Sequence, residues 1–384
     1  MTLGVVAGEA AMVQARPLLL HVFHGFGIGG QEVRAAQLMN RLAGRYQHRI
    51  LALNGVSAAT GRLSKDVDYE ILPAPSLAGP LPRRLLGLAR WLKAQAPDLL
   101  LTYNWGTMDF AAANAFLARL PHIHHEDGFG IDEARRQHRR RIWFRRLVLP
   151  RADAVVVPSR TLELAALDIW RLPPSLVHYI PNGVEIDAFL PPRPDAIPGL
   201  VKQEGDIVVG TLASLRREKN LPRLVRAFAA AFATTAAAKL VIAGEGDERD
   251  AIRAQAKALG IEHRVLLSGY LARPADFVGL FDIFALSSDT EQFPISLVEA
   301  MAAGCAVAST KVGDVADILP ESQAPYIVAP DDEAGLAEAL QRLAADGDLR
   351  RRLGAENRGK VERTYDLSRM VARHDALYRQ ALAR

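Results

Sequence analysis

Residues 291–304 read EQFPISLVEAMAAG, an apolar segment with a proline near its start and a glycine at its end. Pro294 suits the first position of a helix and Gly304 the position just beyond its end, so a helix is predicted between them. Two apolar runs of strand length, Ile283–Leu286 and Ala306–Ser309, flank the segment. A strand, a helix and a second strand form the βαβ unit of a parallel sheet, so this segment predicts an α/β fold.

The same alternation of strands and helices extends over the chain in two series. One series of predicted strands comprises Leu18–Phe23, Arg49–Leu53, Asp98–Tyr103, His122–His125 and Ala154–Pro158. The other comprises Ile207–Leu212, Lys239–Ala243, Val265–Ser268, Ile283–Leu286, Ala306–Ser309 and Tyr326–Val328. The turn Ile180–Val184 and four prolines in residues 191–198 separate them. We therefore expect two doubly wound domains, residues 1–182 and 183–366, with the amphipathic segment 367–384 returning to the first as a helix.

Composition indicates a globular protein of a reducing compartment. Hydrophobic residues make up 49% of the chain and charged residues 23%, and Cys305 is the single cysteine. The segment Met1–Arg16 lacks the basic start and long apolar stretch of a secretory signal, and no segment approaches the ~20 apolar residues of a membrane span. We expect a cytoplasmic protein. Residues 1–184 carry 22 Lys and Arg against 14 Asp and Glu, a balance that favours an anionic partner for the first half.

The start of the predicted 294–304 helix is the first candidate binding site. Free N–H groups at Ile295, Ser296 and Leu297 would form an anion site at the positive end of the helix dipole. Glu299 lies about one turn further on, where its carboxylate can accept two hydrogen bonds from a ribose diol. Glu291 precedes the helix and would face a sugar hydroxyl. Carboxylates at both ends of a pyrophosphate are what a sugar nucleotide requires.

A second candidate is the loop after the strand Ile207–Leu212, which reads ASLRREKN over residues 213–220. Loops at the carboxyl ends of parallel strands bind ligands in open α/β sheets. Lys219, together with Arg216 or Arg217, would neutralise the charge that develops on a departing diphosphate.

A third candidate is the glycine-rich turn at residues 24–32, HGFGIGGQE, between a strand and a helix. Gly25, Gly27 and Gly30 match the G-x-G-x-x-G fingerprint of dinucleotide binding, which also needs a carboxylate about 20 residues later. The second strand ends instead at Leu53-Asn54-Gly55. A nucleotide-dependent, NAD-type oxidoreductase therefore stands as the alternative function rather than the first.

Together these motifs resemble family 4 of the retaining GT-B glycosyltransferases over nearly the whole chain. The pair Glu291 and Glu299 is similar to that family's donor-binding signature, and Gly29-Gly30-Gln31-Glu32 to its first glycine-rich loop. Ile180–Val184 with Asp187 and Phe189 is like its interdomain linker, and Val241–Gly246 matches a further strand and turn. The resemblance implies a GT-B fold, two facing Rossmann-like domains with a cleft between them.

The resemblance also implies an activity and roles for individual residues. The chain would move a sugar from a nucleoside diphosphate, with retention, onto a saccharide or lipid-linked saccharide in bacterial surface polysaccharide or glycolipid assembly. Lys219 would contact the diphosphate and Gly30, beside Gly29, would approach it from the opposite domain. Gly269 and Tyr270 would lie near the base, and Phe293 is placed with the helix start in the donor site.

Three positions depart from the family pattern. Ser214 stands where the family has an arginine, so Arg216 or Arg217 would replace that cation. Gln292 and Pro294 stand where the family has glycines, and Pro294 has no N–H to offer. Asp127 stands where the family has a histidine, with His124 and His125 close by. Because of Ser214 and Pro294, an inactive GT-B-fold binding protein is a second alternative.

No metal or cofactor is expected beyond the sugar nucleotide itself. Asp66-Val67-Asp68 fits the D-x-D pattern of metal-dependent transferases, but it lies far in sequence from the donor motifs and is interpreted as a solvated strand edge. His122 and His124 alternate along a strand with His125 on the other face, so at most two share a face, too few for zinc.

Two basic segments contain apolar side chains at helical spacing, residues 134–151 and 81–93. Such helices lie on anionic membranes, here at the inner face of the cytoplasmic membrane, or are core helices with solvated polar faces. Neither segment belongs to a nucleic-acid reader module, so no nucleic-acid partner is expected.

Overall fold

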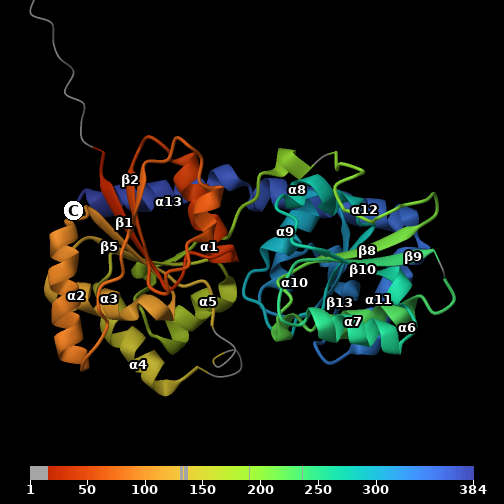
Figure 1. Cartoon of the computed structure of the whole chain (residues 1–384), viewed down its shortest axis with the longest axis horizontal. Coiled ribbons are helices and arrows are strands. Elements are labelled where there is room, and N and C mark those ends of the chain that lie inside the picture. Colours follow the sequence, from red (N-terminus) through yellow and green to blue (C-terminus); the bar gives the residue numbers. More distant parts are fainter. Residues whose placement is uncertain (1–15, 130–132, 134–136, 190, 236) are drawn as a thin grey trace, which may run out of the picture.

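The computed structural model describes residues 16–384 except 130–132, 134–136, 190 and 236. The expectation about a secretory signal therefore concerns residues that lie outside this range, apart from Arg16. The described chain forms two α/β domains side by side, each built around one parallel sheet (Figure 1). The predicted α/β architecture of two facing Rossmann-like domains is confirmed.

The first sheet has seven strands in the order β3-β2-β1-β4-β5-β6-β7, all parallel. These strands are β1 Leu18–Phe23, β2 Gln47–Ala52, β3 Tyr69–Leu72, β4 Leu99–Tyr103, β5 His122–His125, β6 Ala154–Val157 and β7 Val177–Tyr179. The order reverses between β1 and β4, and open parallel sheets bind ligands at such a switch point, beyond the carboxyl ends of the strands.

The second sheet has six parallel strands in the order β10-β9-β8-β11-β12-β13. These strands are β8 Ile207–Leu212, β9 Ala238–Ala243, β10 Val265–Gly269, β11 Ile283–Leu286, β12 Ala306–Thr310 and β13 Ile327–Val328. Its switch point lies between β8 and β11, so the loops after these two strands lie at the ligand edge of the sheet.

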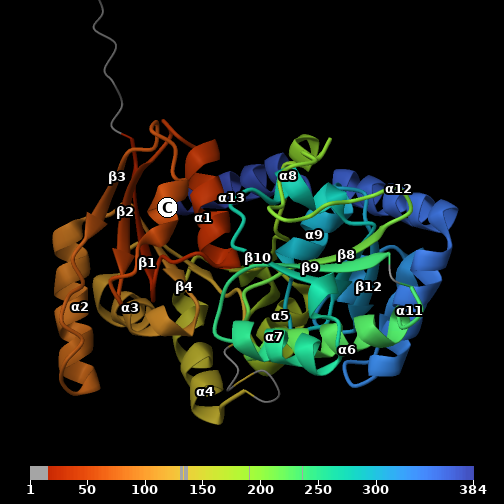
Figure 2. The ribbon, with the colours of Figure 1, turned by 45° about the vertical axis from the view of Figure 1, so that its right-hand side comes forward.

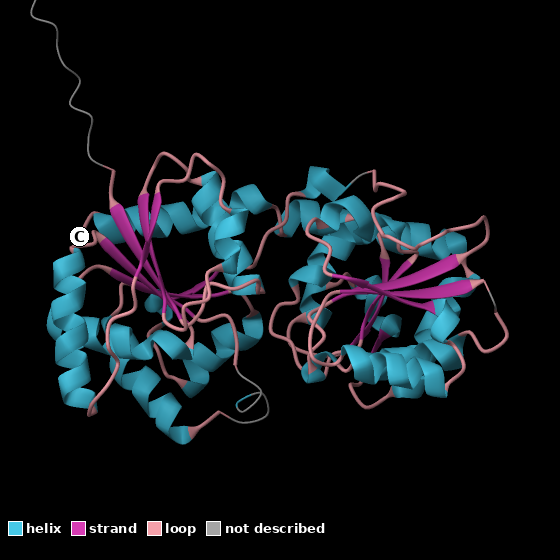
Figure 3. Cartoon of the chain, viewed as in Figure 1, coloured by secondary structure: helices cyan, strands magenta, loops and turns pink. Residues whose placement is uncertain are grey.

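Helices cover both faces of each sheet (Figure 3). In the first domain they are α1 Gly30–Arg41, α2 Leu81–Gln95, α3 Met108–Ala113, α4 Arg139–Val148 and α5 Arg160–Leu164. In the second they are α6 Leu221–Ala231, α7 Arg249–Ala258, α8 Pro274–Phe277, α9 Ile295–Ala302, α10 Val315–Ile318, α11 Glu333–Ala345 and α12 Gly347–Thr364. Most strands thus bury both faces, which explains why they read as continuous apolar runs.

The helix α13, Leu367–Leu382, packs on the first sheet although it follows α12 of the second domain. Its buried residues Met370 and Tyr378 belong to the core of the first domain. Asp375 accepts hydrogen bonds from the Tyr46 hydroxyl at 2.8 Å and from Arg45 at 2.7 Å. Two views show α12 along the second domain and α13 along the first, at the same edge of the molecule (Figures 1 and 2).

A buried carboxylate joins the domains on the far side of this crossing. Asp314 of the second domain is 1% exposed. It accepts hydrogen bonds from the backbone N–H groups of Arg160 and Thr161, the latter at 3.0 Å, and from the Thr161 hydroxyl at 2.8 Å. These N–H groups open α5, so a residue of one domain caps a helix of the other.

Candidate active site

The loops after β8 and β11 bring a lysine and a carboxylate together at the start of α9. Lys219 Nζ lies 2.6 Å from Glu291 Oε1, and the Ser288 hydroxyl donates to the same oxygen at 2.7 Å. Both ions also line a small cavity with Ser296. Residues that the sequence placed in two separate motifs therefore form one polar pocket at the ligand edge of the second sheet.

The start of α9 differs in one detail from the prediction. Ile295 is the first helical residue and Pro294 precedes it as the N-cap. The N–H of Leu297 donates to the Pro294 carbonyl at 3.1 Å, so it is not free as the sequence predicted. The Leu297 side chain is fully buried. The N–H groups of Ile295 and Ser296 remain as the donors that this helix end offers to an anion.

Glu299 lies one turn into α9, as predicted, and its side chain is partly buried. Burial raises the pKa of Glu299 to about 8, and the nearby Arg62 of the first domain opposes this rise. The carboxyl group is therefore mostly protonated at neutral pH in the absence of a ligand. A raised pKa at a ligand edge is typical of a functional group rather than of a surface acid.

The cation-bearing loop is held by the glycine turn that follows β9. A Cβ atom on Gly244 would lie 1.8 Å from the Ala213 carbonyl oxygen, so only glycine permits this contact. Leu215 N–H donates to the Glu245 carbonyl at 2.9 Å, and Glu248 N–H donates to the Leu215 carbonyl at 3.0 Å. Two turns of the second domain thus fix the backbone from which Arg216 and Lys219 project.

Arg216, not Arg217, faces the first domain. Arg216 lines a pocket of about 240 Å³ whose other described lining comes from the first domain. Burial raises the pKa of Glu32 in α1, and Arg216 is one of the charges that oppose this rise. Ser214 is exposed, and its carbonyl accepts from Arg216 N–H at 2.8 Å.

The glycine-rich turn forms the opposite wall of this pocket. Its described lining comprises His24, Gly25, Gly27, Ile28, Gly29, Gln31, Glu32, Asn54, Val56, Tyr103, Asn104 and Arg216. Gly30 opens α1 and comes close to the other domain, because a Cβ there would lie 3.2 Å from Ile295 Cδ1. Gly30 therefore lies opposite the start of α9 across the cleft, whereas a Cβ on Gly29 would meet Glu32 of its own domain.

Asp127, just after β5, and His125, the last residue of β5, differ in their exposure. Asp127 forms an ion pair with the buried Arg34 through both carboxylate oxygens, one of them at 2.8 Å from Arg34 Nη2. His125 is 0% exposed, stacks on Tyr103 at 4.8 Å between ring centroids, and burial lowers its pKa well below the usual value. His125 therefore cannot touch a ligand directly, whereas Asp127 keeps a partly exposed carboxylate.

Asn104 holds three loops of the first domain together. Its side-chain oxygen accepts from Asp127 N–H at 2.6 Å, and its amide donates to Gln31 at the start of α1. Its φ of 57° combined with ψ of −179° is a conformation that side chains rarely adopt. Such backbone strain is concentrated at functional sites, and Asn104 lines the cleft pocket.

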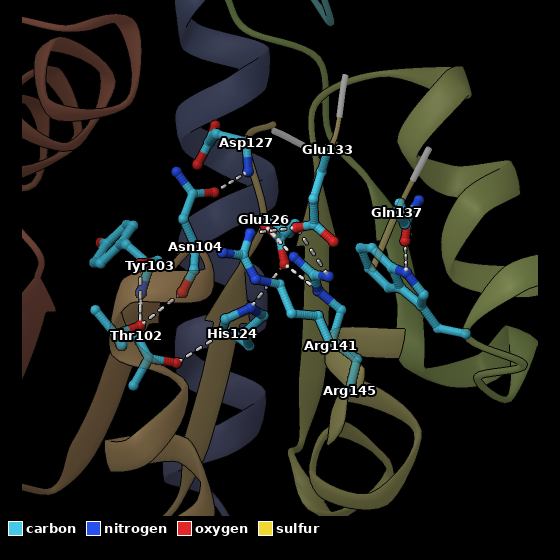
Figure 4. A network of polar contacts seen from close by, with 12 residues as sticks. Thr102, Tyr103, Asn104, His124, Glu126, Asp127, Glu133, Gln137, Arg141 and Arg145 are labelled. Atoms are coloured by element: carbon cyan, nitrogen blue, oxygen red, sulfur yellow. Dashed lines mark hydrogen bonds and ion pairs between the residues drawn. The ribbon is translucent and has the colours of Figure 1, made fainter. Parts of the chain in front are cut away.

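Beneath Asp127 lies a buried network of charges (Figure 4). Glu126 accepts from Arg145 of α4 at 3.0 Å, and both side chains are fully buried. The Arg145 guanidinium also lies over the rings of Trp105 and Trp170, at 5.1 and 4.8 Å from their centroids. The pKa of Glu126 is lowered overall, because Arg145 and His124 together outweigh burial, which is the largest single effect and raises it. Glu126 and Trp105 adjoin Asp127 and Asn104 in the chain, so this network supports the backbone of both residues.

The neighbouring histidines are structural. His122 and His124 share the hydroxyl of Thr102, each at 2.8 Å, which confirms that these two share one face of β5. Among the described residues no group of three His, Cys, Asp or Glu side chains is arranged to hold a metal ion. Asp68 of the D-x-D sequence lies at the edge of the first sheet and pairs with Arg16 at 2.6 Å.

Gly269 and Tyr270, expected near the base, lie at the end of β10, whereas Phe293, expected in the donor site, is buried in the core. Gly269 ends β10, and Tyr270 follows it with 46% of its surface exposed and its hydroxyl accepting from Arg62 of the first domain. Phe293, in contrast, points into the core of the second domain and packs edge-on against Tyr365 at 5.6 Å between ring centroids. The Phe293 side chain packs in the core, so only the backbone of this residue is left to contribute to the donor site.

Comparison with known proteins identifies both halves of the chain. Residues 192–360 match the family model described as "Glycosyl transferases group 1", and residues 29–183 match "Glycosyl transferase 4-like domain". The chain belongs to the group 1 glycosyl transferases. The range matched by the first model contains Lys219, Glu291 and Glu299, and the range matched by the second contains the glycine-rich turn from Gly29 onward.

The names of curated relatives of this group 1 glycosyl transferase indicate varied acceptors. An N-acetyl-alpha-D-glucosaminyl L-malate synthase of Bacillus anthracis is 29% identical over 179 residues, 47% of each chain. A D-inositol 3-phosphate glycosyltransferase of Xylanimonas cellulosilytica is 26% identical over 301 residues, 73% of this chain and 66% of that one. The chain spans about half the length of the first curated relatives it matches.

Solved structures share the fold of this group 1 glycosyl transferase over nearly its whole length. Sucrose-phosphate synthase from Thermosynechococcus elongatus has a TM-score of 0.79 at 23% identity, covering 96% of this chain and 100% of that one. Anabaena HepE in complex with UDP has a TM-score of 0.78 at 20% identity, covering 95% and 100%. At these identities the likeness concerns the GT-B fold.

The two basic segments fold into surface helices in this group 1 glycosyl transferase. Residues 134–136 of one segment lie outside the described range, and the rest forms α4, where Trp143 is 68% and Leu147 52% exposed. The other segment is α2, where Leu86 is 44% exposed. No helix in the described part of the chain is long and apolar enough to cross a bilayer.

Proposed function

We propose that the protein transfers a hexosyl group, with retention, from a nucleoside-diphosphate sugar to a saccharide or lipid-linked saccharide. One observation carries the proposal. The start of α9 has a carboxylate on either side, Glu291 paired with Lys219 and Glu299 with its raised pKa, and Gly30 faces it across the cleft. That arrangement suits a diphosphate between a sugar and a ribose, held from both domains.

In the proposed reaction the bond between the anomeric carbon and the diphosphate oxygen breaks, and a bond from the acceptor oxygen forms on the same face of the sugar. Lys219, Arg216 and the N–H groups of Ile295 and Ser296 stabilise the negative charge on the departing diphosphate. A diphosphate oxygen takes the proton of the acceptor hydroxyl. The reaction therefore requires no enzymic nucleophile, no metal ion and no further cofactor.

In this proposal each domain binds one of the two substrates. We assign donor binding to residues 183–366 and acceptor binding to residues 1–182 completed by 367–384. Asn104 lines the cleft on the acceptor side, and we assign to Asp127, which is hydrogen-bonded to it, the orientation of a hydroxyl of the reacting sugar or the acceptor. The relatives named for the transfer of sugars, and the complexes of HepE with UDP and UDP-glucose, support a sugar nucleotide as donor.

We further propose that the first domain contacts anionic lipid at the inner face of the cytoplasmic membrane, in bacterial surface polysaccharide or glycolipid assembly. The exposed Trp143 and Leu147 lie among the arginines of α4, and α2 adds Leu86. Aromatic and apolar side chains among cations are suited to the headgroup region of an anionic bilayer. Co-sedimentation with vesicles containing phosphatidylglycerol, but not with phosphatidylcholine alone, tests this contact, and Trp143→Ala should weaken it.

Thermal-shift screening with a panel of nucleoside diphosphates and their sugars tests the main proposal. We expect stabilisation by at least one nucleoside diphosphate and none by NADH. Release of the diphosphate in the presence of acceptor, unaffected by EDTA, identifies a metal-independent transferase, and NMR of the product reports the anomer. Binding without any transfer or hydrolysis would indicate an inactive binding protein, and stabilisation by NADH alone would indicate an oxidoreductase.

A further inference from the structure

Arg62 belongs to a segment of the first domain that is hydrogen-bonded to the glycine-rich turn. It ends the short helix η1, Ala58–Arg62, which follows β2. Ala59 N–H donates to the Phe26 carbonyl at 3.0 Å. Asn40 of α1 clamps both sides of the arginine, because its amide donates to the Arg62 carbonyl at 2.9 Å and its oxygen accepts from Ser64 N–H at 2.8 Å. The backbone at Arg62 is therefore held in place by α1.

From this fixed backbone the Arg62 side chain reaches the second domain. Its guanidinium donates a hydrogen bond to the Tyr270 hydroxyl, just after β10. It is also the charged group that opposes the raised pKa of Glu299 in α9. Tyr270 and Glu299 are the residues expected at the base and at the ribose, so a cation of the first domain lies between the two.

The cations of the second domain lie at the other end of the site. Lys219 and Arg216 are at the phosphate end, beside Glu291 and facing Glu32. Gly30 contacts the same end from the first domain. A nucleoside diphosphate spanning the site would thus meet the first domain twice, at Gly30 beside its phosphates and at Arg62 beside its ribose and base.

We propose that Arg62 is a positioning residue through which the first domain closes over the ribose and base of a bound nucleoside diphosphate. On binding, the guanidinium exchanges its hydrogen bond to Tyr270 for contacts with the nucleotide, which its planar, multiply donating group can both stack on and hydrogen-bond. Nucleotide binding is thereby coupled to domain closure. This inference rests on the proposed function, because it requires the nucleotide to lie against Glu299 and Tyr270.

The test compares full-length variants by calorimetry with UDP and GDP, and by small-angle X-ray scattering with and without the nucleotide that binds. Arg62→Ala should weaken binding about tenfold, the scale of losing a charged hydrogen bond, and abolish the nucleotide-induced contraction. Arg62→Lys should recover part of both. Asn40→Ala, which releases the loop without removing the cation, should weaken binding by a smaller factor.

Arg49→Ala is the matched control, because Arg49 pairs with Glu70 at 3.0 Å at the edge of the first sheet. It should bind and contract like the wild type. If Arg62→Ala binds and contracts as the control does, the closing role of Arg62 is wrong while the proposed function stands. If neither wild type nor control binds a nucleoside diphosphate, the proposed function is wrong and this inference with it.

Discussion

Replacing Glu299 by glutamine should stabilise the protein while it harms ligand binding. The carboxyl group of Glu299 has a pKa of about 8 in the folded chain, against an ordinary value of 4.5. Below pH 4.5 the group is protonated in both the folded and the unfolded state, so it contributes no pH dependence. As the pH rises above 4.5, the unfolded chain gains the free energy of ionisation and the folded chain does not, so folding becomes less favourable.

Each pH unit between the two pKa values costs about 1.4 kcal/mol of stability. The cost at pH 7 is therefore at most about 3 kcal/mol, and it stops growing once the folded carboxyl ionises near pH 8. Solvent access to the partly exposed side chain makes this an upper limit. Glutamine has the same shape and no ionisation, so Glu299→Gln removes this cost and should gain up to the same free energy at pH 7.

Melting temperatures of Glu299→Gln and wild type, measured at half-unit steps from pH 5 to pH 9, give the assay. The difference should be small at pH 5, grow with pH, and level off above pH 8. Glu262→Gln, at an exposed position, serves as the control for the loss of one negative charge. In calorimetry the Glu299→Gln protein should bind nucleoside diphosphates more weakly, because the amide, unlike the carboxyl group, cannot ionise on binding and accept hydrogen bonds from both hydroxyls of a ribose diol. A difference in melting temperature that does not change with pH would refute the burial of a neutral carboxyl at this position.

Three further variants probe the site and its frame. Lys219→Ala should slow transfer about 100-fold with saturating donor, since one group that stabilises the departing diphosphate is lost, and unchanged turnover would remove Lys219 from the mechanism. Gly30→Ala should raise the KM for donor because its Cβ meets Ile295 Cδ1 at 3.2 Å, and the double variant Gly30→Ala with Ile295→Ala should recover. Asp314→Ala leaves the N–H groups of Arg160 and Thr161 without their acceptor and should cost about 2 kcal/mol, read as a lower melting temperature, with Asp317→Ala on exposed surface as control.

Strands that are buried on both faces could be predicted from the sequence, whereas the two edge strands of the first sheet could not. β4 is buried along its whole length and reads as an apolar run, so its position was predicted within one residue. β3 exposes Tyr69 and Ile71, at 40% and 46%, and β7 has only three residues. Neither strand has the continuous apolar run that marks a covered strand, and both were missed.

The charged residues at the centre of the candidate site could be predicted from the sequence, but the residues that reach across from one domain to the other could not. The Glu291 and Glu299 pair follows from spacing around a helix start, and Lys219 from a charged loop at the end of a predicted strand, and both patterns are local in sequence. Arg62 and Asp314 carry no such pattern, because their importance comes from contacts with residues more than 150 positions away. Single arginines and aspartates are common on surfaces, so only the packing of one domain on the other reveals what they touch.

The crossing of α13 to the first sheet has a consequence for how the molecule is made. Ribosomes deliver the strands β1 to β7 early, yet the apolar groove that Met370 and Tyr378 fill stays uncovered until residue 382 has been synthesised. Domains commonly acquire their structure in order of synthesis. The second domain can therefore complete its packing before the first, and the nascent protein exposes this apolar groove until the end of its synthesis.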